Sequence, residues 1–191
     1  MIELPVDSIS DLAGQHCGFE ACATPVCLPS VPPRAGDACW VAGWGLTDYD
    51  RETYPESLMS VGLNIFSTEY AWQKTMNAGD VDFTSEFMAG LPDKDGDGLT
   101  DAGSDSCSGD SGGPLVCRSG DNLILTGLVS SGIDCGKEGL PGIYANVYSE
   151  MEWIREFVGD EAGTTKPVNK FLKIILDLNS YQSQRQRNKQ R

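Results

Sequence analysis

The residues of this chain best suited to covalent chemistry lie in a glycine-rich segment at positions 105–114, Asp-Ser-Cys-Ser-Gly-Asp-Ser-Gly-Gly-Pro. A serine hydroxyl attacks well only when a positioned base removes its proton, so Ser111 supplies an attacking oxygen without its activation. Glycines beside it let backbone N–H groups converge on a developing oxyanion, which a Cβ atom would obstruct. The segment predicts nucleophilic attack on a carbonyl. The alternative is a glycine-rich turn with an incidental serine.

This segment and several others resemble the trypsin and chymotrypsin family of serine endopeptidases. The family carries its nucleophile in a Gly-Asp-Ser-Gly-Gly-Pro run, which here occupies positions 109–114. The resemblance implies that Ser111 is the nucleophile and that the amides of Gly109 and Ser111 form the oxyanion hole. Further matching segments follow in family order within positions 1–158: 25–29 (Pro-Val-Cys-Leu-Pro), 39–47 (Cys-Trp-Val-Ala-Gly-Trp-Gly-Leu-Thr), 115–117 (Leu-Val-Cys), 127–130 (Gly-Leu-Val-Ser) and 141–147 (Pro-Gly-Ile-Tyr-Ala-Asn-Val).

Asp105 lies six residues before Ser111, where trypsin-like members carry the carboxylate at the floor of the specificity pocket. A carboxylate buried there would select Arg or Lys, because a cationic side chain neutralises it through charge-assisted hydrogen bonds. The alternative for Asp105 is an ordinary solvated loop acid. The resemblance also implies that the remaining substrate-binding positions are Gly132 and Gly142, which line the pocket, and Ser130, whose backbone pairs with the substrate chain. Ser131 stands where the family usually has Trp, which predicts a wider pocket.

The single histidine, His16, lies in a polar segment next to Cys17, unlike the catalytic histidine of the family. We interpret it as a surface or linker residue. The catalytic aspartate is also missing, since Met1-Ile-Glu-Leu4 resembles the strand that follows it in the family. We therefore expect the chain to be the C-terminal half of a protease, nearly inactive alone, with its start at an internal methionine; a true half-protein is the other interpretation. A separate N-terminal barrel would then be its partner.

Seven cysteines cannot all pair within one chain. The resemblance implies the disulfides Cys39–Cys117 and Cys107–Cys135. Cys17 and Cys22 can bridge only across a tight turn, which leaves Cys27 over. Such a framework predicts an oxidising, extracellular compartment, and the family is largely secreted. The first residues carry no signal-peptide pattern, and no apolar run approaches the roughly 18 residues that cross a bilayer.

Alternating and apolar runs predict strands at 38–45, 57–65, 114–117, 123–130 and 142–147, separated by Gly, Pro and Asp turns. A short helix is predicted at 67–76. Ser149 with Glu152 predicts a capping box for a closing helix that ends near residue 158, with Trp153, Ile154, Phe157 and Val158 on its apolar face. The predicted fold is all-β. By resemblance it is the second six-stranded antiparallel barrel of a two-barrel protease, in a domain at 1–158, followed by a linker and basic tail at 159–191.

An acidic segment, Asp93-Lys-Asp-Gly-Asp-Gly-Leu-Thr-Asp101, reads as a calcium loop. Carboxylates at alternate positions can converge on one hard cation, and Gly98 permits a sharp turn. The predicted ligands are Asp93, Asp95, Asp97, the carbonyl of Leu99, and Asp101. Such calcium would be structural, and catalysis would need no cofactor. The alternative is a solvated acidic loop.

The net charge of −14 argues against nucleic-acid binding and favours cationic substrates. Within the tail, Val168, Phe171, Leu172, Ile175 and Leu178 fit one face of a short helix, either for a partner or membrane surface or as part of a flexible extension.

We therefore predict a trypsin-like serine endopeptidase that acts on proteins or peptides after Arg or Lys. The alternative functions are a non-catalytic protease homologue that binds partners and a calcium-dependent interaction module.

Overall fold

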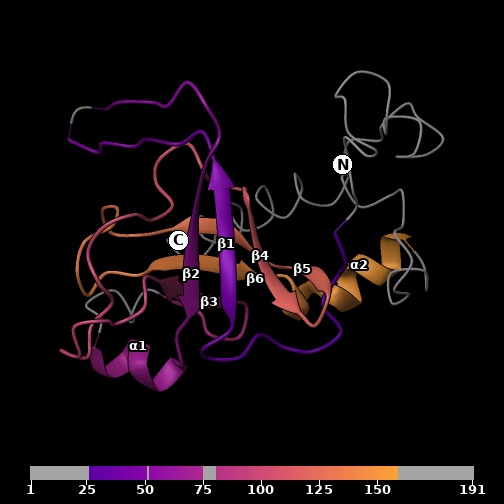
Figure 1. The fold of residues 1–191 in the computed structure, drawn as a ribbon. Coiled ribbons are helices and arrows are strands. Elements are labelled where there is room, and N and C mark those ends of the chain that lie inside the picture. Colours follow the sequence, from indigo (N-terminus) through magenta and orange to yellow (C-terminus); the bar gives the residue numbers. More distant parts are fainter. Residues whose placement is uncertain (1–25, 51, 75–80, 159–191) are drawn as a thin grey trace, which may run out of the picture.

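The computed structural model describes residues 26–50, 52–74 and 81–158, and their strands close into one antiparallel barrel (Figure 1). The order around the barrel is β1-β2-β3-β6-β5-β4, with every neighbouring pair antiparallel. This confirms the predicted six-stranded all-β barrel. The strands are β1 (Ala38–Gly43), β2 (Met59–Ile65), β3 (Glu86–Gly90), β4 (Pro114–Ser119), β5 (Asn122–Ser131) and β6 (Gly142–Asn146).

The barrel interior is filled by the inward-facing residues of all six strands. In β1, Cys39 and Val41 are buried whereas Trp40 between them is 43% exposed, as the two-residue period of a strand requires. Closure of the sheet removes the exposed edges that an open sheet would carry. The interior cluster consists of Cys39, Val41, Leu63, Ile65, Phe87, Ala89, Leu115, Cys117, Val129 and Tyr144.

Two helices pack on different parts of the outer surface of the barrel (Figure 1). The helix α1 (Thr68–Lys74) contributes Ala71 to a buried cluster with Val81, Met88 and Ile143. The helix α2 (Met151–Val158) contributes Met151 and Ile154, both buried, to a second cluster. The strand residues in that second cluster are Leu125, Leu128 and Ala145, with Val147 beside them.

Two local predictions differ from the structure. The strand β3 carries no alternation, because all five of its residues are buried, and the pattern analysis did not single it out. The predicted capping box at Ser149 is wrong, because a 3₁₀ turn, η3 (Tyr148–Glu150), precedes α2. The Ser149 hydroxyl lies inside that turn and donates to the Asn146 carbonyl oxygen at 2.7 Å. The side chains of Phe157 and Val158 lie outside the described residues.

Two disulfides cross-link the barrel and its loops. Cys39 of β1 pairs with Cys117 of β4, directly opposite it in the ladder. Cys107 pairs with Cys135, across 28 residues of sequence. These are the two pairs that the family resemblance implies. Cys27 is a free, half-buried thiol, and Cys17 and Cys22 lie outside the described residues, as do His16 and the tail at 159–191.

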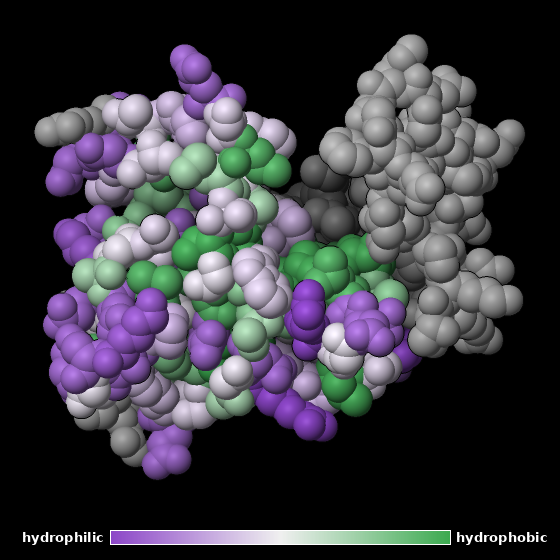
Figure 2. Space-filling model, viewed as in Figure 1, coloured by the Kyte–Doolittle hydropathy of each residue, from purple (hydrophilic) through white to green (hydrophobic). Residues whose placement is uncertain are grey.

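In the part of the chain that the structure describes, no helix is long and apolar enough to span a bilayer. The surface instead mixes polar and apolar patches, and Figure 2 shows apolar side chains on the face that β1 presents. Exposed large side chains on β1, on β2 and beside them are Trp40, Trp44, Leu58 and Met59.

Candidate active site

Ser111 lies in an exposed turn between β3 and β4 that folds back on itself. Within this turn the Asp110 amide donates to the Cys107 carbonyl at 2.9 Å, and the Gly113 amide donates to the Asp110 carbonyl at 2.8 Å. Gly109 has φ of +100°, a region in which a side chain would be strained. Neither the Gly109 nor the Ser111 amide has a hydrogen-bond acceptor among the described residues. The turn therefore leaves two donors beside the Ser111 hydroxyl for an incoming oxygen.

The Asp110 side chain links the turn to the segment that follows β1. Its Oδ1 accepts from the Gly45 amide at 2.8 Å, and its Oδ2 accepts from the Cys107 amide at 3.0 Å. A Cβ atom at Gly45 would lie 2.5 Å from the Asp110 carboxylate carbon, and one at Gly43 would collide with Oδ1. The two glycines of the Gly-Trp-Gly segment thus leave room for the Asp110 carboxylate, a role that the sequence analysis missed. The sequence signal for this role was a pair of glycines flanking a Trp at the end of a strand.

A cavity of about 220 Å³ opens beside Ser111. It brings together five of the predicted site residues, from three stretches of the chain. Ser130, at the end of β5, is half-buried, whereas Gly132 just after it is exposed at the rim. Ser131, at the position for which the family resemblance predicted a wider pocket, is also exposed. The predicted residues that line this cavity are Asp105, Ser111, Ser130, Gly132 and Gly142.

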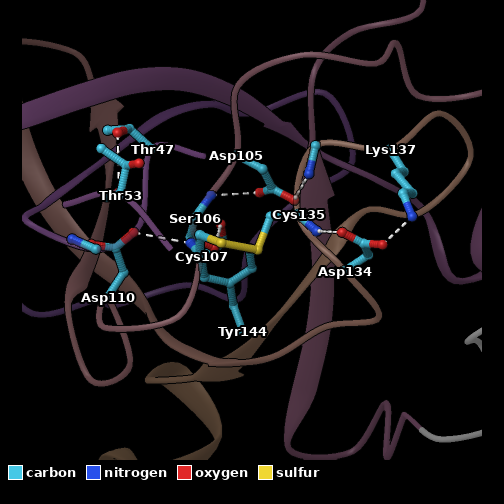
Figure 3. Close-up of a disulfide and its surroundings, with 12 residues drawn as sticks. Thr47, Thr53, Asp105, Ser106, Cys107, Asp110, Asp134, Cys135, Lys137 and Tyr144 are labelled. Atoms are coloured by element: carbon cyan, nitrogen blue, oxygen red, sulfur yellow. Dashed lines mark hydrogen bonds and ion pairs between the residues drawn. A yellow bond between two sulfur atoms is a disulfide. The ribbon is translucent and has the colours of Figure 1, made fainter. Parts of the chain in front are cut away.

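Asp105 lies against the Cys107–Cys135 disulfide and Tyr144 (Figure 3). Its Oδ1 accepts from the Ser106 amide at 2.7 Å, and its Oδ2 accepts from the Gly136 amide at 3.5 Å. Burial raises the pKa of the Asp105 carboxyl to about 6, because removal from water disfavours the charged form. Two amides and no cation among the described residues satisfy Asp105, so the cavity carries an uncompensated negative charge at pH 7.

The walls around Asp105 are held by neighbouring hydroxyls and glycines. The Ser106 hydroxyl lies 2.9 Å from the Tyr144 hydroxyl. Burial, together with the charge of Asp105, raises the pKa of Tyr144, so this phenol stays neutral. A Cβ atom at Gly142 would lie 3.3 Å from Asp105 Oδ1, so a side chain there would crowd the cavity. Lys137 nearby pairs with Asp134, so this ion pair does not neutralise the charge of Asp105.

A second cavity, of about 260 Å³, lies on the other side of Asp105. It is lined by Asp105 and Asp110, by Gly43 at the end of β1, and by Gly45, Leu46 and Thr47 after that strand. The two cavities also share Tyr49 and both cysteines of the Cys107–Cys135 disulfide. Sequence spacing alone did not indicate this second cavity, because its walls come from separate segments at 41–49, 59–61, 103–110 and 135.

The acidic segment at 93–101 brings three of its four carboxylates together. Oxygen atoms of Asp93, Asp95 and Asp101 lie within 4.8 Å of one another, a spacing that suits one metal ion. Asp97 is not part of this group, and its Oδ1 accepts from the Leu99 amide at 2.8 Å. Asp93 accepts from the amides of Gly96 at 2.7 Å and Gly98 at 2.9 Å, so the loop is ordered by its own backbone.

Activation of Ser111 requires a proton acceptor, and the described residues contain no histidine. They do contain the exposed Ser111 side chain, two amides without an acceptor and the half-buried carboxylate of Asp105 in the adjoining cavity. Ser111 and Asp105 line the same cavity.

Comparison with known proteins agrees with this arrangement. A family model described as Trypsin matches residues 13–154. Trypsin II-P29 of Gallus gallus is 37% identical over 140 residues, which cover 73% of this chain and 50% of that protein. Venom plasminogen activator TSV-PA of Trimeresurus stejnegeri is 34% identical over 149 residues, covering 75% of this chain and 50% of that protein.

A solved structure has the same fold. It is titled as neuropsin, a serine protease expressed in the limbic system of mouse brain, and superposes with a TM-score of 0.58 at 32% sequence identity. The match covers 71% of this chain and 54% of that one. The chain spans about half the length of the curated relatives it matches. The barrel, the serine turn and the family match together show that this chain belongs to the trypsin family of serine proteases.

Proposed function

We propose that this chain is the nucleophile-bearing half of a serine endopeptidase. The observation that carries the proposal is the placement of Ser111, with the free amides of Gly109 and Ser111, at the mouth of the cavity that holds Asp105. Ser111 Oγ would attack the substrate carbonyl and lose its proton to a base. Collapse of the tetrahedral intermediate would release the amine product and leave an acyl-enzyme, which water hydrolyses. The two amides would stabilise the oxyanion.

The cavity favours Arg or Lys before the cleaved bond. Asp105 is a half-buried carboxylate that pairs with no cation among the described residues. A guanidinium or ammonium group would supply the missing charge through short hydrogen bonds. Gly132 and Gly142 keep the way to Asp105 open, and Ser130 lies where a substrate backbone can pair with the end of β5.

The proton acceptor would come from a further barrel that docks on this one. Support comes from the exposed Trp40, Trp44 and Met59 on and beside β1 and β2, since large apolar side chains gathered on one face mark an interface. Without the base we expect hydrolysis to be slower by a factor on the order of 10⁴ to 10⁶. The substrates would be proteins or peptides.

The second candidate is a non-catalytic homologue that binds partners. Two observations favour it: no histidine occurs among the described residues, and one relative, 32% identical, is named Inactive snake venom serine proteinase 13 of Crotalus adamanteus. Labelling of Ser111 distinguishes the two candidates.

The acidic loop would hold a structural calcium ion. Asp93, Asp95 and Asp101 would provide carboxylate oxygens, and the Leu99 carbonyl would add a further oxygen, whereas Asp97, also predicted from the sequence, lies outside this group. The hard oxygen donors fit a hard cation, and the ion would take no part in the chemical step. The two disulfides and the family membership support an extracellular location.

A peptidyl phosphonate ester tests the enzymatic proposal, because it phosphonylates only an activated serine. The natural protein, isolated with any partner barrel, should be labelled at Ser111 by a phosphonate with an arginine side chain and much less by one with glutamate. The Ser111→Ala variant should not react. Absence of labelling in the intact natural protein contradicts the endopeptidase and favours the binding protein.

A further inference from the structure

A buried glutamate outside the cavity is tied to one of the cavity's own residues. Glu86 of β3 is only 7% exposed. Its Oε1 accepts from the Ser130 hydroxyl at 3.3 Å, and its Oε2 accepts from the Asp82 amide at 3.1 Å. A buried carboxylate is retained only where such donors satisfy it. Glu86 was not among the residues that the sequence analysis singled out.

The glutamate reaches β5 across an intervening strand. Glu86 pairs with Ala145 of β6, and Ala145 pairs with Leu128 of β5. Directly opposite residues in a ladder share one face of the sheet, so Glu86, Ala145 and Leu128 lie on the same face. The interaction therefore joins residues 44 positions apart in sequence.

Ser130 needs such an anchor because the ladder is irregular there. Val129 pairs with Tyr144 and Ser131 pairs with Ile143, so Ser130 is the extra residue of a bulge with no Cα partner of its own on β6. A bulged residue lacks part of the ladder's restraint and can be re-aimed by its side chain. Ser130 also lines the cavity beside Ser111.

The backbone around Glu86 is held by hydrogen bonds at both ends of the turn that precedes β3. The amides of Ser85 and Glu86 both donate to the Asp82 carbonyl, at 2.9 and 2.8 Å. The Asn146 amide donates to the Ser85 carbonyl at 2.8 Å and so attaches this turn to the end of β6. The hydrogen bond to Ser130 therefore begins at a fixed point of the barrel.

We propose that Glu86 is a positioning residue for extended substrates, holding Ser130 and thereby the edge of β5 on which a peptide backbone pairs. The inference rests on the proposed function, because it assumes that a substrate chain lies along Ser130–Gly132. Glu86 does not itself line the cavity that holds Asp105. Its loss should therefore weaken binding of a peptide backbone and leave binding of an isolated cationic group unchanged.

Two ligands separate these effects in the full 191-residue chain. Agmatine offers only a guanidinium on a short stem, whereas acetyl-Ala-Ala-agmatine adds a backbone that can pair with β5. In the Glu86→Met variant we expect about tenfold weaker binding of the peptide and agmatine affinity within about twofold, the loss typical of one hydrogen bond to a charged group. Glu86→Gln keeps one oxygen acceptor and should lose about threefold or less.

The controls define what would overturn the inference. Ser130→Ala should match Glu86→Met, and the double variant should lose no more than either, because both remove one interaction. Glu152→Gln, at an exposed glutamate of α2, should change neither affinity. Equal loss of both ligands in any folded variant overturns the role of Glu86. If Glu86→Met does not fold, unchanged peptide binding in both Ser130→Ala and Glu86→Gln overturns it. Failure of the unmutated chain to bind either ligand instead contradicts the proposed function.

Discussion

The serine turn and the acidic loop are both rich in Asp and Gly, yet their carboxylates are held in opposite ways. In the turn, Asp110 bonds to Gly45, which lies 65 residues away, and Gly112 bonds to Val129 of β5. In the loop, Asp93, Asp95 and Asp97 accept from amides two to five residues ahead. The barrel thus determines the geometry of the turn, whereas the loop organises itself. Of the carboxylates compared, only that of Asp110 anchors its segment to a distant part of the barrel.

The largest effect should follow from removing the long-range anchor. Asp110→Ala leaves the amides of Gly45 and Cys107 without their acceptor, and we expect it to lower the free energy of unfolding by about 3 kcal/mol. Urea denaturation measures this change. Asp121→Ala, at an exposed position, is the matched control and should stay within about 0.5 kcal/mol of the unmutated chain. Equal changes in the two variants would show that the turn is as self-contained as the loop.

The pH dependence of cation binding should be the next largest effect. Agmatine needs the charged form of Asp105, whose pKa is about 6. Affinity should therefore rise with pH through this value, by about tenfold between pH 5 and 7, and level off above. The stability of the chain without ligand changes with pH in the opposite direction. The folded state holds this proton more tightly than the unfolded state, so stability falls as pH rises from about 4 to 6. Calorimetric titration at several pH values tests the binding profile, and a flat profile would contradict a buried Asp105.

Crowding the cavity should have a smaller effect that depends on position. A Cβ atom at Gly142 would lie 3.1 Å from Tyr144 and 3.3 Å from Asp105, whereas one at Gly132 would meet nothing closer than 3.6 Å. We expect Gly142→Ala to weaken agmatine binding about fivefold and Gly132→Ala about twofold or less. The reverse order of the two affinities would show that the ligand lies elsewhere.

The smallest effect should come from the acidic loop. If Asp93, Asp95 and Asp101 bind calcium, a millimolar concentration should raise the melting temperature by about 2 to 5 °C, because the ion stabilises only the folded state. Asp93→Asn should abolish the rise, and Asp97→Asn, which lies outside the group, should retain most of it. A rise of equal size with magnesium, or none with calcium, would leave the loop as a solvated acidic segment.

The same contrast explains what the sequence predicted. The family and the barrel are confirmed, because alternating strands such as β1 and motifs such as 109–114 are local patterns. The strand β3 was not predicted, because a fully buried strand shows no alternation of apolar and polar residues. Two hydrogen bonds could not be predicted from local patterns. Asp110 and Gly45 lie 65 residues apart in the sequence, and Glu86 and Ser130 lie 44 residues apart. The roles of Ser111, Gly109 and the cavity residues stay predictions until they are tested.

The most direct test of the account is whether Asp105 and Ser111 belong to one binding site. Agmatine titrated into isotope-labelled chain should shift the amide resonances of Ser106, Ser111 and Ser130 along one binding curve. The Asp105→Asn variant should bind at least about tenfold more weakly while keeping its spectrum otherwise. Equal affinity in the variant, or shifts that exclude Ser111, would contradict a cation pocket that opens onto the nucleophile.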